Sequence, residues 1–380
     1  MAVAFFAAIV GARVAMAAVT FPLEAKWSAT LPAQPEFAPA FDATRIYVAL
    51  KSKQLVALLI ADGTVSWSVE CPMTAAPAAG AGLVYAGNDD LIEARSDADG
   101  KTQWRRPVQG KVASLHWDAG WLFAQTEPGL FLAIRASDGH IVWQKEFGSP
   151  IDTGARPAAA GQRLYLPLKD GRVLALSLES GDEVWTKKLT EPATGILPVG
   201  DRVFVGARDN RLYSLSAENG RTKWPWITGA DLLGLPVLDT KRIYFIALDN
   251  SLYGNRRNSG SMDWRQVLPF RPFTGPLLSG ATLIVAGVAA QLHAYNAADG
   301  KAIGTFELKG AENEEMLLAA PAHLTASDTF ILVTRGGQVR AVGSSATPAA
   351  PAPTDPAANP ADTPSPAAPD DAPVGATSRP

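Results

Sequence analysis

One short motif recurs along the chain at intervals of 37 to 42 residues. In each copy a small residue is followed by Gly six positions later and by Trp four positions after that, as in ALSLESGDEVW at 175–185. The glycines are Gly63, Gly100, Gly139, Gly181, Gly220, Gly260 and Gly300. The tryptophans are Trp67, Trp104, Trp143, Trp185, Trp224 and Trp264, and the seventh copy has Gly304 instead. Because a fixed period of about 40 residues is typical of stacked repeats, this motif constrains the fold more than composition does.

Two incomplete copies stand at the ends of the repeat region. Trp27 lies 40 residues before Trp67 and has no Gly turn in front of it. Residues 329–343, TFILVTRGGQVRAVG, supply the first part of a repeat and then stop. The two fragments complement each other, so we expect the N-terminus to supply the last strand of an eighth unit. This arrangement predicts a closed ring of eight units.

Each unit has the composition of a small β-sheet. Runs of β-branched and aromatic residues bounded by Gly, Asp and Asn, such as RIYVAL at 45–50 and RVFVGA at 202–207, indicate four short strands per unit. Several strands are apolar on both faces, which favours sheets that are covered on both sides. The sequence therefore predicts an all-β, eight-bladed β-propeller of four-stranded antiparallel blades. We interpret the repeated indoles as structural groups that dock each blade on its neighbour; they are Trp27, Trp67, Trp104, Trp143, Trp185, Trp224 and Trp264.

The composition of the two ends differs from that of the repeats. Residues 1–18 contain an apolar run followed by Ala-Met-Ala, which indicates a signal peptide or an N-terminal apolar segment, although Arg13 comes after the run. We expect the propeller at 19–343 and a disordered Pro/Ala-rich tail at 344–380. The expected location is the periplasm, with an uncleaved anchor or a cytoplasmic protein as alternatives.

Charge and cysteine content narrow the classes of partner and chemistry. The net charge is −3, which gives no global attraction for nucleic acid. Cys71 is the only cysteine, so it has no partner for a disulfide within the chain. His116, His140, His293 and His323 occupy unrelated repeat positions, and no linear metal motif accompanies them. We therefore expect no metal site and no catalytic residue.

The recurring Ala-Leu-x-x-x-x-Gly-x-x-x-Trp motif resembles that of propellers of the pyrroloquinoline quinone (PQQ) type, over residues 23–343. In the dehydrogenase branch the resemblance implies calcium held by carboxylate and amide groups, a catalytic Asp and commonly two adjacent cysteines. This chain has one cysteine and minimal blades, so we expect no cofactor. The other branch is the cofactor-free propellers of the BamB type, which fit in size and blade count. This chain departs from them in lacking a lipobox cysteine and a Leu-Arg-Gly-x-Ser-x-Pro loop, since residues 187–200 read KKLTEPATGILPVG.

A propeller binds partners mainly through loops on a rigid scaffold. In a four-stranded meander, the loops between second and third strands share one face with the loops between blades, and the Gly turns lie on the opposite face. On the first face we expect partner-binding residues in three loops, with folding back onto the blades as the alternative. They are Arg208, Asp209, Trp226, Phe270, Arg271 and Phe273, and the acidic stretch at 309–316 is a weaker candidate.

The function that these features predict is that of a non-catalytic protein-interaction scaffold of the bacterial envelope. The resemblance to BamB-type propellers implies assistance in the assembly of outer-membrane β-barrel proteins, with the barrel-assembly machinery as partner. We expect a monomer without an integral membrane span after processing. The alternatives are a PQQ-dependent oxidoreductase and a propeller that binds a ligand or glycan.

Overall fold

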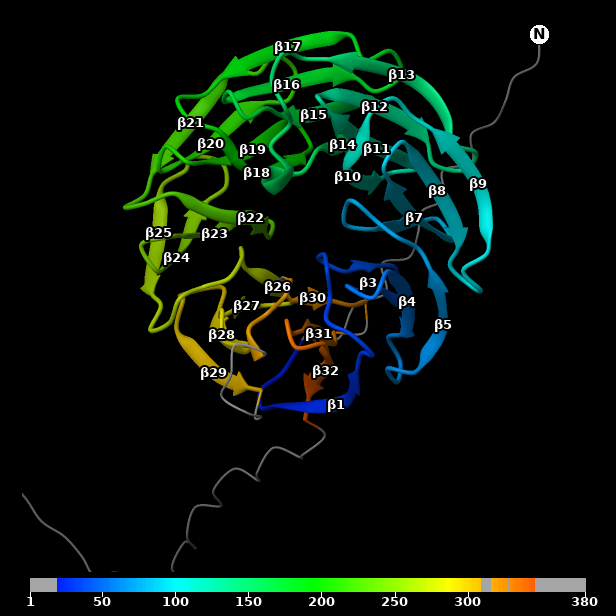
Figure 1. Cartoon of the computed structure of the whole chain (residues 1–380). Coiled ribbons are helices and arrows are strands. Elements are labelled where there is room, and N and C mark those ends of the chain that lie inside the picture. Colours follow the sequence, from blue (N-terminus) through cyan, green and yellow to red (C-terminus); the bar gives the residue numbers. More distant parts are fainter. Residues whose placement is uncertain (1–18, 309–315, 321, 327, 346–380) are drawn as a thin grey trace, which may run out of the picture. The chain divides into compact units, whose positions relative to one another are not determined.

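The computed structural model describes residues 19–308, 316–320, 322–326 and 328–345 (Figure 1). Within these residues the strands form eight antiparallel sheets of four strands each, arranged in a ring. The prediction of an eight-bladed β-propeller is therefore confirmed. Residues 1–18, residues 309–315 of the acidic stretch at 309–316 and residues 346–380 of the expected tail at 344–380 lie outside the described residues.

The blades follow one another in chain order. Blade 1 contains β2 (Ala40–Phe41), β3 (Arg45–Ala49), β4 (Gln54–Leu59) and β5 (Val65–Glu70); blade 2 contains β6 (Ala78–Gly80), β7 (Leu83–Asn88), β8 (Leu91–Ser96) and β9 (Thr102–Pro107). Blade 3 contains β10 (Lys111–Asp118), β11 (Trp121–Glu127), β12 (Leu130–Arg135) and β13 (His140–Glu146). After the 3-10 turn η1 (Thr153–Ala155), blade 4 contains β14 (Ala158–Ala160), β15 (Arg163–Pro167), β16 (Arg172–Ser177) and β17 (Glu183–Lys188).

The second half of the ring has the same plan. Blade 5 contains β18 (Ala193–Val199), β19 (Arg202–Ala207), β20 (Arg211–Ser216) and β21 (Thr222–Ile227); blade 6 contains β22 (Leu232–Leu238), β23 (Arg242–Ala247), β24 (Ser251–Arg256) and β25 (Met262–Val267). Blade 7 contains β26 (Leu277–Ser279), β27 (Thr282–Ala286), β28 (Gln291–Asn296) and β29 (Ala302–Glu307). Blade 8 contains β30 (His323–Leu324), β31 (Phe330–Val333), β32 (Gln338–Ser344) and β1 (Leu23–Thr30).

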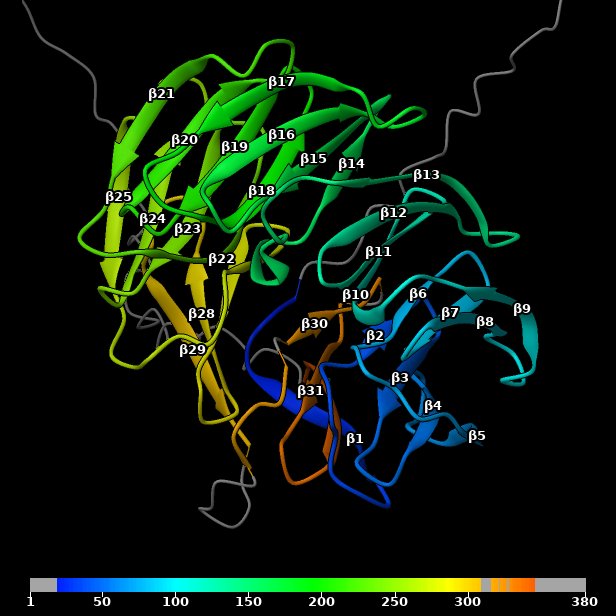
Figure 2. The ribbon, with the colours of Figure 1, turned by 45° about the horizontal axis from the view of Figure 1, so that its top comes forward.

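The ring is closed by strands from the two ends of the repeat region. In blade 8 the strand order is β1-β32-β31-β30, and β1 pairs antiparallel with β32 from Leu23↔Ser344 to Thr30↔Gln338. Figure 2 shows the blue β1 beside the orange strands of this blade. The backbone N–H of Ser345 also donates to the carbonyl of Pro22 at 2.9 Å, so the pairing extends just beyond the expected end of the propeller. The complementary end fragments therefore meet in one sheet, as predicted.

Each repeated Trp contacts the Gly turn of the following blade. Gly220 has φ +68°, and a Cβ at this position would lie 2.7 Å from the Trp185 ring, so a side chain is excluded by both backbone and packing. The Nε1–H of Trp185 donates to the carbonyl of Ala217 in the same turn at 2.9 Å. Equivalent Nε1 hydrogen bonds, of 2.7 to 3.1 Å, are made by Trp27, Trp67, Trp104, Trp143 and Trp264. Trp224 keeps the ring contact with Gly260, but its Nε1 has no partner among the described residues.

The small residue of the motif makes room for the indole within the blade. Ala175 lies directly across the strand pair from Trp185, and Gly254 lies across from Trp264. A Cβ on Gly254 would approach the Trp264 ring to 2.3 Å. Small residues and indoles therefore occupy paired positions in neighbouring strands of the same blade.

Blade 7 lacks the motif Trp and is completed from the N-terminus. The Phe21 ring lies against Gly304, where an added Cβ would be 2.6 Å from it. Val19 is buried beside it, and its N–H donates to the Ser279 hydroxyl at 3.0 Å. The segment before β1 thus packs on the blade that precedes it, which the sequence did not indicate.

Candidate functional site

The loop face consists of the loops between second and third strands together with the loops between blades. The ring of β-sheets fixes the ends of these loops, so the positions of side chains on this face are set by the blades. All six predicted partner-binding residues belong to blades 5 to 7. In the structure some of these six side chains are accessible to solvent, and others are buried and stabilise the loops.

Asp209 is a structural residue of the β19–β20 loop. Its side chain is buried, accepts a hydrogen bond from the Tyr213 hydroxyl and lies 3.4 Å from the Arg211 guanidinium. Burial and this hydrogen bond raise the pKa of Tyr213 to about 12, so the phenol remains a donor at neutral pH. The sequence Asp-Asn-x-Leu-Tyr recurs at 249–253, where Tyr253 donates to Asp249 at 2.7 Å. That repeated spacing is the signal that would have identified Asp209 as a loop anchor.

Arg208 is half-exposed on the loop face. Its guanidinium lies 3.3 Å from the buried carboxylate of Asp152, which belongs to the loop between blades 3 and 4. Asp152 also accepts from the Gly154 N–H at 3.0 Å and begins η1. Arg208 therefore ties blade 5 to this loop while part of its side chain stays accessible.

Trp226 lies in an outer strand and not in a loop. It is within β21, opposite Leu212 of β20, and its ring packs partly buried against the apolar cluster between blades 5 and 6. The alternation of the strand directs Pro225 and Ile227 outward instead. Trp226 therefore contributes mainly to packing.

The segment after β25 folds its aromatic rings back onto blade 7. Phe270 stacks on His293 with ring centroids 3.7 Å apart, and burial lowers the pKa of His293. Phe273 packs half-buried against the cluster of blades 7 and 8, and its N–H donates to the Ala286 carbonyl at 2.8 Å. Arg271, between them, is exposed. Of the three residues predicted in this stretch, Arg271 is exposed and the two phenylalanines are half-buried.

Exposed apolar side chains on blades 5 and 6 were not anticipated from the sequence. Ile227 and Val267 are 64% and 61% exposed at the ends of β21 and β25, and Leu248 is exposed in the β23–β24 loop. The N–H of Thr228 donates to the Asn210 carbonyl, and the N–H of Leu268 donates to the Asn250 carbonyl. The ends of β21 and β25 therefore lie beside the β19–β20 and β23–β24 loops. The signal lies three residues after the motif Trp, where the other blades carry Thr30, Glu70, Pro107, Glu146, Lys188 and Glu307. Only blades 5 and 6 have an aliphatic residue there.

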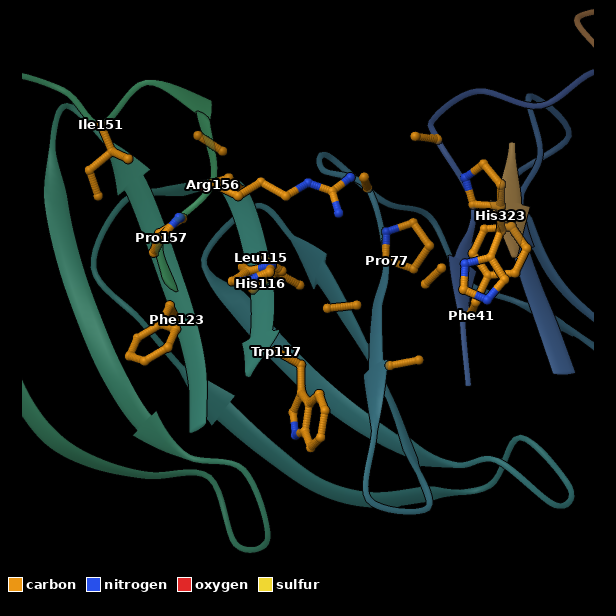
Figure 3. Close-up of a pocket in the computed structure, with 18 of the residues that line it drawn as sticks. Phe41, Pro77, Leu115, His116, Trp117, Phe123, Ile151, Arg156, Pro157 and His323 are labelled. Carbon is orange, nitrogen blue, oxygen red and sulfur yellow. The ribbon is translucent and has the colours of Figure 1, made fainter. Parts of the chain in front are cut away.

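A cavity of about 580 Å³ opens among the innermost strands of blades 1 to 3 and the adjoining parts of blades 4 and 8 (Figure 3). Much of its wall is alanine and proline, together with a stacked pair of Phe41 and His323 whose ring centroids are 4.1 Å apart. Burial, with a smaller contribution from the charge of Arg156, lowers the pKa of His116 to about 4. Burial also lowers the pKa of His323. Within the described ranges no group of three or more His, Cys, Asp or Glu side chains is arranged to hold a metal ion.

Helices are nearly absent from the described part of the chain, and none there is long and apolar enough to cross a membrane.

Comparison with known proteins supports the same family assignment as the repeats. The family model described as outer membrane protein assembly factor BamB matches residues 21–116, 88–199, 132–231 and 169–351. The BamB of Yersinia pestis is 24% identical over 275 residues, covering 68% of each chain. That of Moranella endobia is 24% identical over 318 residues, covering 78% of this chain and 69% of its own.

Solved structures show the likeness of fold. BamB from Moraxella catarrhalis superposes with a TM-score of 0.67 at 17% identity, covering 85% of this chain and 98% of that one. The C-terminal WD40 domain of Sif2 gives 0.68 at 9% identity, covering 84% and 98%. The fold is therefore shared by proteins outside the BamB family. The family is shown by the sequence matches. The overlapping matches to the family model run from residue 21 to residue 351. The chain therefore belongs to the family of the outer membrane protein assembly factor BamB.

Proposed function

We propose that this protein is a non-catalytic scaffold of the bacterial envelope that assists the assembly of outer-membrane β-barrel proteins. The relatives named as outer membrane protein assembly factors support this role over that of a PQQ-dependent oxidoreductase. The observation that carries the proposal is the aliphatic surface on the loop face of blades 5 and 6, since exposed apolar groups beside polar ones are typical of protein interaction sites.

The proposed partner surface comprises Ile227, Leu248 and Val267 with Arg208 and Arg271. The three aliphatic side chains are exposed on a rigid scaffold, and the Leu248 N–H donates to Asp231 in the loop between blades 5 and 6 at 2.8 Å. Arg271 adds an exposed positive charge, Arg208 adds a half-exposed guanidinium that is paired with Asp152, and arginine is frequent at interfaces with apolar anchors. We propose that a protein of the barrel-assembly machinery binds here through an apolar segment bordered by acidic side chains.

The location and the chain ends form part of the same proposal. The protein would act as a monomer in the periplasm after export directed by residues 1–18. The tail, expected at 344–380, begins after Ser345 because Ser344 and Ser345 pair with the segment at residues 22–23. It would serve as a spacer or docking segment, because its composition offers little apolar surface to bury.

The test is mild crosslinking and affinity recovery from intact cells, with mass spectrometry of the recovered proteins. The full chain should recover the central barrel-assembly protein and its companions. The double variant Ile227→Glu/Val267→Glu should reduce that recovery at least tenfold, because it places two charges where an apolar contact is proposed.

The matched control is Val184→Glu. Val184 is also an exposed aliphatic residue on an outermost strand, but it lies near the Gly turns of the opposite face. This variant should recover the machinery as the parent does. Failure of the parent chain to recover any barrel-assembly protein would overturn the function. Full recovery with the double variant would overturn the surface alone.

A further inference from the structure

The cavity among the innermost strands of blades 1 to 3, the axial cavity, combines apolar side chains with polar surface. Alanine and proline from β2, β6 and the segments before them form one side, and Phe123 and Phe131 of blade 3 contribute aromatic surface. Its volume of about 580 Å³ is within the range of small-molecule sites, which is about 300–1,000 Å³. None of the lining residues that the structure describes is acidic.

One cation extends into this space. Arg156 lies at the start of blade 4, and its side chain crosses the cavity from beside Pro157 toward Pro77 of blade 2 (Figure 3). Among the residues that the structure describes, its guanidinium has no ion pair and no hydrogen-bond partner. The three carboxylates that adjoin the lining segments in sequence are engaged elsewhere. Asp42 accepts from the Tyr47 hydroxyl and from the Arg45 N–H. Asp152 pairs with Arg208, and Asp118 accepts from the Ala159 N–H at 2.8 Å.

The backbone holds Arg156 in an unusual conformation. Its φ of +22° and ψ of 136° lie outside the regions that non-glycine residues favour. The following Pro157 accounts for the extended ψ, because a residue before proline is restricted to such values. Asp152 fixes the preceding turn through the Gly154 N–H, and Ile151 bridges to Leu168. Strained residues held by their surroundings are concentrated at ligand sites.

The remaining polar groups of the wall do not neutralise this charge. His116 and His323 are neutral at pH 7, because burial lowers the pKa of both imidazoles. Among the described residues that line the cavity, Arg156 is therefore the only one with a charged side chain at neutral pH. A single guanidinium in a cavity lined largely by alanine, proline and aromatic side chains matches one carboxylate, since the planar fork can bind both oxygens.

We propose that the axial cavity is a binding site for a small organic carboxylate with an aromatic body, held by Arg156. The aromatic part would lie between the Phe41–His323 pair and the alanine wall, and the carboxylate would meet the guanidinium. The carboxylate has two possible sources, a free aromatic acid or the C-terminus of a peptide that ends in an aromatic residue. This site is separate from the surface proposed on blades 5 and 6.

The proposal is tested by calorimetric titration of the full chain with N-acetyl-phenylalanine and, in parallel, with 2-naphthoate. Both acids should bind to one site. N-acetyl-phenylalaninamide, which keeps the ring but lacks the charge, should bind at least tenfold more weakly. A tripeptide with a C-terminal phenylalanine distinguishes the two sources: binding by the tripeptide points to peptide ends, and binding by the free acids alone points to a small metabolite.

Substitutions assign the binding to this cavity. Arg156→Gln should weaken binding of both acids at least tenfold, whereas Arg156→Lys should have an intermediate effect because the charge remains but the fork is lost. Ala38→Phe should also weaken binding by filling the cavity while leaving Arg156 in place. The matched control, Arg221→Gln, removes an exposed arginine from a Gly turn and should bind as the parent does. Equal affinity for acid and amide, parental affinity in a folded Arg156→Gln variant, or no binding by the parent would each overturn the proposal.

Discussion

At the residue scale, a motif tryptophan stabilises the propeller by ring packing and by an Nε1 hydrogen bond. Within the described ranges, Trp185 makes both contacts, and Trp224 makes only the first. Trp185 packs on Gly220 and donates its Nε1–H to Ala217, whereas Trp224 packs on Gly260 without an Nε1 partner among the described residues. Trp185→Ala should lower the free energy of unfolding by about 3–5 kcal/mol, the range for deletion of a large buried ring. Trp185→Phe should cost about 1 kcal/mol more than Trp224→Phe, because only the first also loses a hydrogen bond. Urea unfolding followed by far-UV circular dichroism measures both differences, and unchanged stability in Trp185→Ala would exclude the docking role.

Single residues also show which contacts can be predicted from the sequence. The phase of the repeat predicts where each Trp and Gly stands, because every copy must present the same surfaces to its neighbours. The phase alone does not predict that Asp209 meets Tyr213. The second Asp-Asn-x-Leu-Tyr at 249–253 indicates that contact, which forms in a loop where Asn210 has φ +61°. Arg156 was also missed. Its environment is formed by blades 1 to 4 and blade 8, and these meet only around the axis.

At the element scale, β1 determines whether the ring is closed. Removal of residues 1–30 should expose the edge of β32 and the blade 7 surface that Phe21 covers, and free strand edges promote association. We expect a much lower melting temperature and aggregation for this truncation, and no such loss when only residues 1–18 are removed. A synthetic peptide of residues 19–30 should restore the melting temperature in a concentration-dependent way. Equal stability of the two truncations would contradict closure by β1.

Elements differ in how well the sequence predicts them. The second strands follow the predicted runs closely, as β3 (Arg45–Ala49) and β19 (Arg202–Ala207) show, because they are buried on both faces and bounded by turn residues. The innermost strands vary from two residues in β2 to eight in β10. These strands line the axis and pair along one edge only, so local sequence specifies their ends weakly. The axial cavity lies among these innermost strands.

At the scale of the whole molecule, the repeats add up pKa shifts whose effect on stability is negligible in a single blade. In the Gly turns, Asp62, Asp138 and Asp299 each accept a backbone N–H from two residues on, at 2.9 to 3.1 Å. This hydrogen bond is the main cause that lowers the pKa of each carboxyl below its usual value of about 4. Blade 5 has Asn219 in the same role, with its amide oxygen 3.1 Å from the N–H of Arg221. An amide therefore makes the same turn without titrating.

The repeated turns thus predict a shared dependence of stability on acid. Because the folded-state pKa values are lowered, the unfolded chain binds more protons near pH 4. The stabilisation is present above the unfolded pKa and is lost as pH falls through the folded values. The triple variant Asp62→Asn, Asp138→Asn, Asp299→Asn should match the parent at pH 7 and lose less stability between pH 5 and pH 2. Each exposed carboxylate contributes little, so the effect should emerge only in the combined variant. Urea titrations at a series of pH values measure it. Identical acid dependence of variant and parent would mean that these turns do not couple protonation to folding. The loss of stability in acid would then arise from other carboxylates such as Glu93. Burial raises the pKa of Glu93, but the contacts with Arg105 and Arg95 outweigh burial and lower it.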